Sequence, residues 1–123
     1  MAAKIRLASV ALDCADPQAL AEFYRAFVGG EIVFGTEEFV AISVGGLFLA
    51  TVRIPDHRPP TWPGGDRPQQ MHLDFSVDDL DAAQARAVEL GATPADTQPD
   101  PDRWRVLLDP AGHPFCVSVV IPD

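Results

Sequence analysis

The stretch Met71-His72-Leu73-Asp74-Phe75 decides the fold, together with Asp109-Pro110-Ala111-Gly112-His113-Pro114-Phe115-Cys116 near the other end of the chain. Apolar and polar residues alternate in the first stretch, and the second passes from a turn into an apolar run, so both are typical of the start of a strand. The two halves of the chain repeat the same order of elements. The sequence therefore predicts an internal repeat, which governs the interpretation of the whole fold.

The first half opens with a strand-like run, Ile5–Cys14, followed by Asp16 and Pro17. Asp is a favoured N-cap, and Pro suits the first helical position because its missing N–H costs nothing there. Apolar residues at helical spacing then predict a helix that ends at Gly29. Three short strands are expected to follow, with a Gly-Gly hairpin turn between the last two: Glu31–Phe34, Phe39–Val44 and Leu47–Ile54.

The second half follows the same plan. Met71–Val77 is typical of a strand, Asp78 or Asp79 is expected to cap the next helix, and Gly91 to end it. Further strands are expected in three places: Thr93–Thr97, Arg103–Leu108 and Phe115–Ile121.

The two halves can be superimposed along the sequence. A shift of 63 residues places Asp16 on Asp79 and Ser9 on His72, and a shift of 64 places Val52 on Cys116. The sequence therefore predicts a single α+β domain over residues 1–123 with two tandem βαβββ modules, at about 4–54 and 71–122. The modules are expected to form a curved mixed sheet around a cleft, with the helices on the outer face.

A proline-rich loop, residues 55–70, joins the predicted modules. Because proline cannot donate to a sheet ladder, the loop is expected to be stiff and extended. Its one large apolar residue, Trp62, lies between prolines. Trp62 is interpreted either as an anchor that packs the loop on the core or as a lid over a pocket, and the anchor is favoured because ordered loops usually need one.

Size and composition indicate a globular protein. With 123 residues, 47% apolar and 22% charged, the chain is able to bury a core. A formal charge of −9 argues against nucleic acid or an anionic membrane as a partner. The first strand-like run starts at Ile5 and no apolar run is long, so no signal peptide or membrane span is expected. Only two cysteines occur, Cys14 and Cys116, and they are far apart in the sequence, so no disulfide framework is expected. The sequence therefore predicts a reduced, cytoplasmic protein.

The motifs resemble the vicinal oxygen chelate superfamily, which includes glyoxalase I, extradiol dioxygenases and bleomycin-resistance proteins. The paired βαβββ modules, the helix start at Asp16-Pro17 and the Asp-Pro-x-Gly tract at Asp109–Gly112 carry the resemblance. The glyoxalase-like branch is the most similar, through the Pro-Pro-x-Trp-Pro loop at Pro59–Pro63, the His-Leu-Asp segment at His72–Asp74 and the Gly-His-Pro-Phe-Cys ending at Gly112–Cys116. The resemblance covers nearly the whole chain.

Metal-dependent members of that superfamily place one ligand on the first and last strands of each module. Carried over to this chain, the resemblance puts these positions at Ser9, Val52, His72 and Cys116. Only His72 is a ligand of the family's usual kind, Val52 cannot coordinate, and Cys116 would bind a soft metal only as thiolate. Two ligands do not make a zinc site, so no metal cofactor is expected; a divalent ion on His72 and Cys116 is the alternative.

Strand alternation extends the candidate cleft, because residues two apart share a face. Asp74 then joins His72, and Ser118 joins Cys116. A metal site of His72, Asp74 and Cys116 is conceivable, although neighbouring residues on one face of a strand rarely converge on one ion. Trp104 is expected in the core or the cleft wall. The predicted ligand-binding cleft comprises Ser9, Ala50, Val52, Trp62, His72, Asp74, Cys116 and Ser118.

Three functions follow from this cleft. The first is a metal-free, glyoxalase-like protein that binds a small organic molecule, since a mostly apolar pocket with a few polar groups suits such a ligand. The second is a lyase, isomerase or dioxygenase-like enzyme, with a divalent metal or with His72 as general base. The third is a closed cleft and a role in an assembly. A homodimer is the expected partner state, and no substrate can be named.

Overall fold

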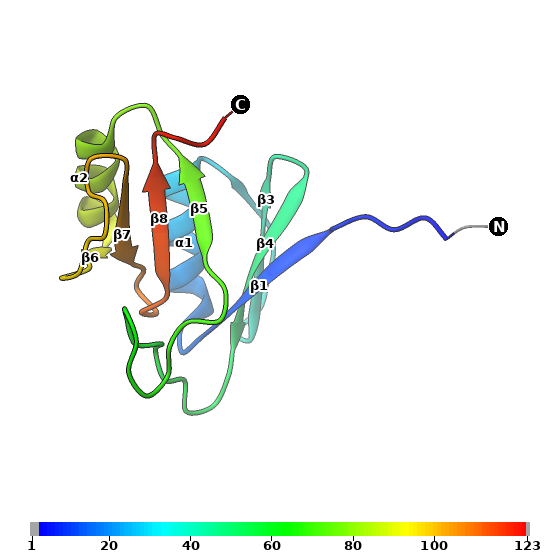
Figure 1. The fold of residues 1–123 in the computed structure, drawn as a ribbon. Coiled ribbons are helices and arrows are strands. Elements are labelled where there is room, and N and C mark those ends of the chain that lie inside the picture. Colours follow the sequence, from blue (N-terminus) through cyan, green and yellow to red (C-terminus); the bar gives the residue numbers. More distant parts are fainter. Residues whose placement is uncertain (1–2, 123) are drawn as a thin grey trace. The chain divides into compact units, whose positions relative to one another are not determined.

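The computed structural model describes residues 3–122 and divides the chain into two compact units, the first ending at His57 and the second beginning at Arg58. Each unit has the element order βαβββ (Figure 1). The first contains β1 (Ser9–Cys14), α1 (Pro17–Val28), β2 (Glu31–Gly35), β3 (Phe39–Val44) and β4 (Leu47–Arg53). The second contains β5 (Leu73–Ser76), α2 (Leu80–Leu90), β6 (Thr93–Pro94), β7 (Trp104–Leu108) and β8 (Pro114–Ser118).

The two units have the same sheet topology. The strand order is β1-β4-β3-β2 in the first sheet and β5-β8-β7-β6 in the second. In each sheet the module's first and last strands pair in parallel, and the remaining neighbours are antiparallel. The predicted α+β class and the tandem βαβββ modules are therefore confirmed, with a separate four-stranded mixed sheet in each module.

Both helices begin at the aspartates expected to cap them. The Ala19 N–H donates to Asp16 Oδ1 over 3.1 Å, and the Ala82 N–H donates to Asp79 Oδ1 over 3.0 Å. Asp79 rather than Asp78 is thus the cap of α2. Gly29 ends α1 with a φ of 84°, a left-handed conformation that glycine adopts without a Cβ penalty.

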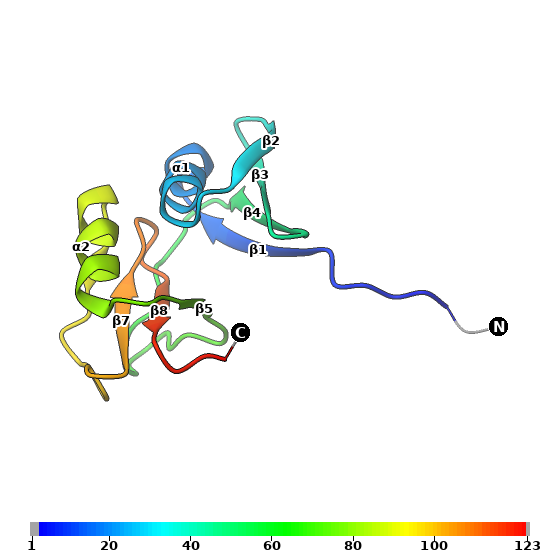
Figure 2. The same cartoon turned by 90° about the horizontal axis from the view of Figure 1, so that it is seen from above.

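Each helix covers one face of its own sheet (Figure 2). In the first unit the buried Thr51 hydroxyl on β4 donates to the Pro17 carbonyl of α1 over 2.7 Å. In the second unit Phe75 and Phe115 meet edge to face, 5.8 Å between ring centroids, and Arg105 pairs with Asp81 of α2. Because strand residues alternate, the neighbours of these residues point to the face without a helix.

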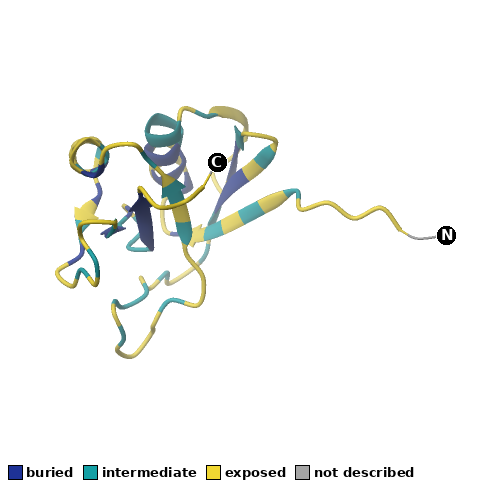
Figure 3. Cartoon of the chain, turned by 45° about the horizontal axis from the view of Figure 1, so that its top comes forward, coloured by how far each residue is buried: buried dark blue, intermediate teal, exposed yellow. Residues whose placement is uncertain are grey.

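Several strands are shorter than predicted. β1 starts at Ser9 rather than Ile5, and residues 3–7 are exposed (Figure 3). β5 covers Leu73–Ser76, and β8 ends at Ser118 where its register with β5 ends. The apolar alternation continues past the last residue that has a strand partner, so the pattern alone overestimates strand length. Among the described residues, no helix has the length and apolar character needed to cross a bilayer.

The proline-rich loop is folded back on itself within the second unit, and not extended throughout as predicted. Thr61 bridges to Pro68, and the Thr61 N–H donates to the Arg67 carbonyl over 2.8 Å. The Trp62–Pro63 peptide bond is cis. The loop also contacts the turn before β8, where a Cβ on Gly112 would lie 2.3 Å from the Pro59 Cβ. Only glycine fits at that contact.

Candidate functional site

The face of the second sheet that points away from α2 carries a row of side chains set by strand register. Cys116 lies at the centre, paired with Asp74 on β5 and with Val106 on β7. One pair further along, Ser118 on β8 is opposite Trp104 on β7. The row therefore brings a carboxylate, a thiol, a hydroxyl and an indole from three strands onto one surface.

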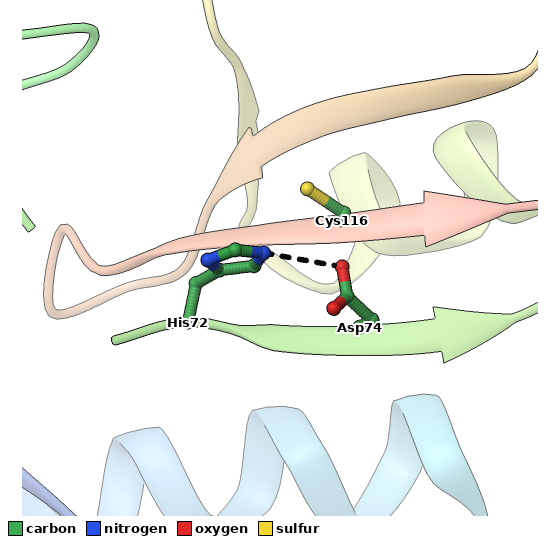
Figure 4. A group of neighbouring side chains, drawn as sticks. All are labelled: His72, Asp74 and Cys116. Carbon is green, nitrogen blue, oxygen red and sulfur yellow. Dashed lines mark ion pairs between the residues drawn. The ribbon is translucent and has the colours of Figure 1, made fainter. Parts of the chain in front are cut away.

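His72 immediately precedes β5, and its imidazole ring points toward Asp74 of this row. Its Nε2 lies 3.3 Å from Asp74 Oδ1 (Figure 4). His72, Asp74 and Cys116 each offer one atom that could bind a metal ion, and these three atoms lie within 4.8 Å of one another. Strand alternation alone did not favour such an approach of the three side chains. It is present in the structure, where His72 lies outside the regular strand. The His72 and Asp74 side chains are 38% and 50% exposed, so their ion pair contributes little stability.

Cys116 is present as a neutral thiol. Burial raises the pKa of Cys116 to about 11, and the nearby Asp74 carboxylate, which also accepts a hydrogen bond from the thiol, adds to this increase. A thiol in this state is a poor nucleophile at neutral pH, because the thiolate is the reactive form. The raised pKa therefore disfavours a role for Cys116 as a thiolate nucleophile.

A cavity of about 300 Å³ opens on this face of the second sheet. Its wall is mostly apolar, with two indoles, and its polar groups are an amide, an imidazole, a carboxylate and a hydroxyl. The lining residues are Trp62, Gln69, His72, Asp74, Trp104, Val106, Pro114, Cys116, Ser118 and Ile121. All of them belong to the second unit.

Trp62 fixes the loop at the edge of this cavity. Its indole N–H donates to the Thr97 carbonyl over 3.2 Å, and its ring packs with Trp104 against the buried cluster of Ala95, Val106 and Cys116. The predicted anchor interpretation agrees with these contacts. Because the anchored ring also lines the cavity, the same residue forms part of a pocket wall.

The predicted cleft residues fall into two groups. Trp62, His72, Asp74, Cys116 and Ser118 line the cavity together. Ser9, Ala50 and Val52 lie in the first unit, on the face of its sheet opposite the Thr51–Pro17 contact. None of these three is among the residues that line the described cavity.

The register corrects one predicted correspondence between the modules. Ala11 pairs with Ala50 in the first sheet, as Asp74 pairs with Cys116 in the second. With the helix caps superimposed, Ala11 corresponds to Asp74, so the counterpart of Cys116 is Ala50 and not Val52. The error arose because two residues connect β3 to β4 and five connect β7 to β8, so the last strands correspond at a shift of 66 residues and not 64.

Five lining residues were not among the predicted cleft residues, although one of them, Trp104, was expected in the core or the cleft wall. Val106 is two positions from Trp104 on β7, and Pro114 is two positions from Cys116 on β8. Alternation along these strands would have indicated both. Gln69 and Ile121 lie outside regular strands, where periodicity gives no signal. His57 and His113 are not part of the described lining; the His113 N–H donates to Asp109 Oδ1 over 3.0 Å and closes the turn before β8.

Comparison with known families gives one match that spans both modules. Residues 9–118 match the family of glyoxalase-like domains, which spans the chain from the start of β1 to the end of β8. The chain belongs to this family. The resemblance predicted from the motifs is therefore confirmed. A search of curated proteins gave no match for the sequence.

Solved structures share the glyoxalase-like fold. A glyoxalase/bleomycin resistance protein/dioxygenase family enzyme from Burkholderia phytofirmans is 18% identical, with a TM-score of 0.73 over 95% of this chain and 100% of its own. A lactoylglutathione lyase from Agrobacterium tumefaciens is 24% identical, with a TM-score of 0.63 over 92% of both chains. A fosfomycin resistance protein mutant from Listeria monocytogenes, in complex with Mn(II) and dihydroxypropylphosphonic acid, is 15% identical, with a TM-score of 0.71 over 97% and 91%. At these identities the likeness concerns the fold.

Proposed function

We propose that this glyoxalase-like protein binds a small organic molecule in the cavity of its second module, without a metal ion. The observation that carries the proposal is the cavity itself, about 300 Å³ with an apolar wall and convergent polar groups. Ligand pockets have this composition, in which the wall supplies affinity and a few polar groups fix orientation. His72 and Asp74 lie at the accessible side of the cavity, where they can meet a ligand's polar end.

Binding without chemistry agrees with the state of the candidate reactive groups. The raised pKa of Cys116 keeps its thiol protonated. The exposed ring of His72 is oriented by Asp74 and can donate or accept a hydrogen bond, a role that serves ligand recognition. A general-base role of His72 requires a substrate proton within hydrogen-bond reach of its ring.

A thermal-shift screen of small aromatic compounds tests this proposal. A ligand at one hundred times its Kd should stabilise the protein by about 2.7 kcal/mol. Trp104→Leu and His72→Ala should reduce the shift, while His57→Ala, outside the described lining, should not. The melting temperature of each variant without ligand shows whether its fold is retained. Absence of any stabilising compound, or hits that are unaffected in both cavity variants, would contradict the proposal.

One observation favours a second candidate, a metal-dependent lyase, isomerase or dioxygenase-like enzyme. His72, Asp74 and Cys116 offer three donors of different type within 4.8 Å of one another. Catalytic zinc sites use three protein ligands and leave a position for water or substrate. These three residues would hold the ion, which would polarise substrate oxygens as a Lewis acid.

Metal titration separates this candidate from the metal-free binder. Equilibrium dialysis against Zn²⁺, Ni²⁺, Mn²⁺ and Fe²⁺ should give one ion per chain if the second candidate holds, and His72→Ala should abolish it. Because Cys116 must lose its proton to bind, proton release should accompany uptake. Sub-stoichiometric binding of all four ions would exclude the metal-dependent candidate.

We further propose a cytoplasmic homodimer. Neither Cys14 nor Cys116 forms a disulfide bond among the described residues, which suits a reducing compartment. Phe34, Phe39 and Phe48 lie on the face of the first sheet opposite α1 and remain 51%, 37% and 41% exposed. Exposed apolar clusters of this kind mark contact surfaces. Light scattering should give the mass of two chains, and Phe48→Lys should shift it toward one; a monomeric parent protein would contradict the dimer.

A further inference from the structure

The cavity in the second module is lined by a negative side chain that no Lys or Arg of the described lining balances. Asp74 is the one carboxylate among the described lining residues, and none of them is Lys or Arg. Gln69 Oε1 is a buried acceptor that has no hydrogen-bond partner among the described residues, and Gln69 lines the same cavity. Buried polar atoms are rarely left unpaired in proteins, so this oxygen indicates a donor that arrives with a ligand.

The indoles supply the other part of the recognition. Trp62 and Trp104 line the cavity from the loop and from β7, and both pack against the cluster of Val106 and Cys116. The Trp62 N–H is engaged by the Thr97 carbonyl, so Trp62 contributes ring surface to the cavity and no free donor. Indole faces attract flat rings and organic cations.

The groups that face Asp74 leave its carboxylate able to bind a ligand. His72 Nε2 lies at 3.3 Å and the Cys116 thiol donates to it, but the carboxylate remains half exposed. A charged carboxylate binds a cationic donor more strongly than a neutral one, and a bidentate pair of N–H groups adds a second hydrogen bond. An anionic ligand would meet repulsion from Asp74, with no fixed cation among the described lining residues to offset it.

We propose that the ligand is a flat aromatic cation of one or two rings, such as an aryl amidine, whose charged group pairs with Asp74 and whose ring packs on Trp62 and Trp104. This rests on the proposed binding function and specifies its ligand class. The unpaired Gln69 oxygen accepts a further N–H of the same cation. The cavity volume, about 300 Å³, accommodates a two-ring compound.

Calorimetric titration with three isosteric probes tests the charge preference. 2-Naphthamidine, 2-naphthamide and 2-naphthoate share one ring system and carry a positive, a neutral and a negative group. The amidine should bind about tenfold more tightly than the amide, a modest factor because Asp74 is half exposed. The naphthoate should bind most weakly.

Matched variants assign the preference to its residues. Asp74→Asn keeps the shape of the side chain and should lower amidine affinity to that of the amide, while leaving amide affinity unchanged. Gln69→Leu should weaken the amidine about threefold or more. Trp104→Leu should weaken all three probes. Asp78→Asn, an exposed carboxylate outside the described lining, is the control and should change none of them.

The outcomes separate this inference from the proposed function. Equal or tighter binding of the naphthoate, or a charge preference that survives Asp74→Asn, overturns the cation while Trp104-dependent binding still supports a small-molecule site. If 2-naphthamidine does not bind while other aromatic compounds do, the cation is likewise overturned and the small-molecule site is retained. Failure of every compound in the wider screen overturns both.

Discussion

Asp74 is in contact with two groups of different chemistry, and this decides what the site can do. On one side is the imidazole of His72, and on the other the Cys116 thiol, which donates to it. A carboxylate beside the thiol opposes negative charge at the sulfur. The residue therefore favours recognition of donors and disfavours thiolate chemistry.

The ionisation of Cys116 tests this arrangement directly. In a Cys14→Ala background, alkylation by iodoacetamide should follow a pKa of about 11 for Cys116, and Asp74→Asn should lower that pKa. Because the folded-state pKa of Cys116 lies above the usual thiol value of 9.0, the stability gained from the neutral thiol is present below pH 9.0 and is lost as the pH rises through about 11. A thiol that reacts rapidly at pH 7 would contradict the assignment.

Asp109 has a structural role that a substitution should reveal. Its buried carboxylate accepts from the Ala111 and His113 N–H groups over 2.9 and 3.0 Å, and this closes the turn before β8. Asp109→Ala leaves both donors without that acceptor and should reduce the free energy of unfolding by about 1 to 3 kcal/mol in urea titration. The exposed Asp102→Ala provides the comparison and should lie within about 0.5 kcal/mol of the parent.

At the scale of elements, the two helix caps are equivalent and can be compared with each other. Asp16→Ala and Asp79→Ala each remove one side-chain acceptor, and each should cost about 1 kcal/mol of unfolding free energy. The Asn variants keep the acceptor and should retain most of that stability. Urea denaturation measures all four, and an Ala variant as stable as its Asn counterpart would show that the cap bond contributes nothing.

The elements were the most predictable part of the molecule, because they depend on local chemistry. Asp16 followed by Pro17 marks the start of a helix wherever it occurs, and Gly29 and Gly91 end the helices as expected. Strand ends were less predictable, since the apolar run in Phe115–Ile121 continues beyond Ser118, the last residue with a strand partner. A sequence pattern indicates the propensity to form a strand, whereas the length of the strand depends on how far a neighbouring strand is present to pair with it.

The candidate site was predictable in part. Asp74 and Ser118 were identified from strand alternation, His72 and Cys116 from the family resemblance, and Trp62 from its place in the loop, and all five line one cavity. The cavity also depends on Gln69 and Ile121, whose positions are set by loop packing and carry no periodic signal. The three-donor convergence depends on His72 lying just before β5, a deviation from regular geometry that the sequence does not encode as a pattern.

At the scale of the whole molecule, net charge should tune ligand binding. A formal charge of −9 attracts cations at long range, and salt screens this attraction. The Kd of 2-naphthamidine should rise several-fold between about 10 mM and 500 mM NaCl, since the Debye length shrinks from about 30 Å to less than 8 Å. The neutral 2-naphthamide is the control. An amidine Kd that does not depend on salt would contradict an electrostatic contribution.

The shared register of the two sheets has a consequence for protein engineering. Where the second module has Asp74 beside Cys116, the first has Ala11 beside Ala50. Ala11→Asp with Ala50→Cys would therefore place the same carboxylate and thiol at the equivalent register positions of the first sheet.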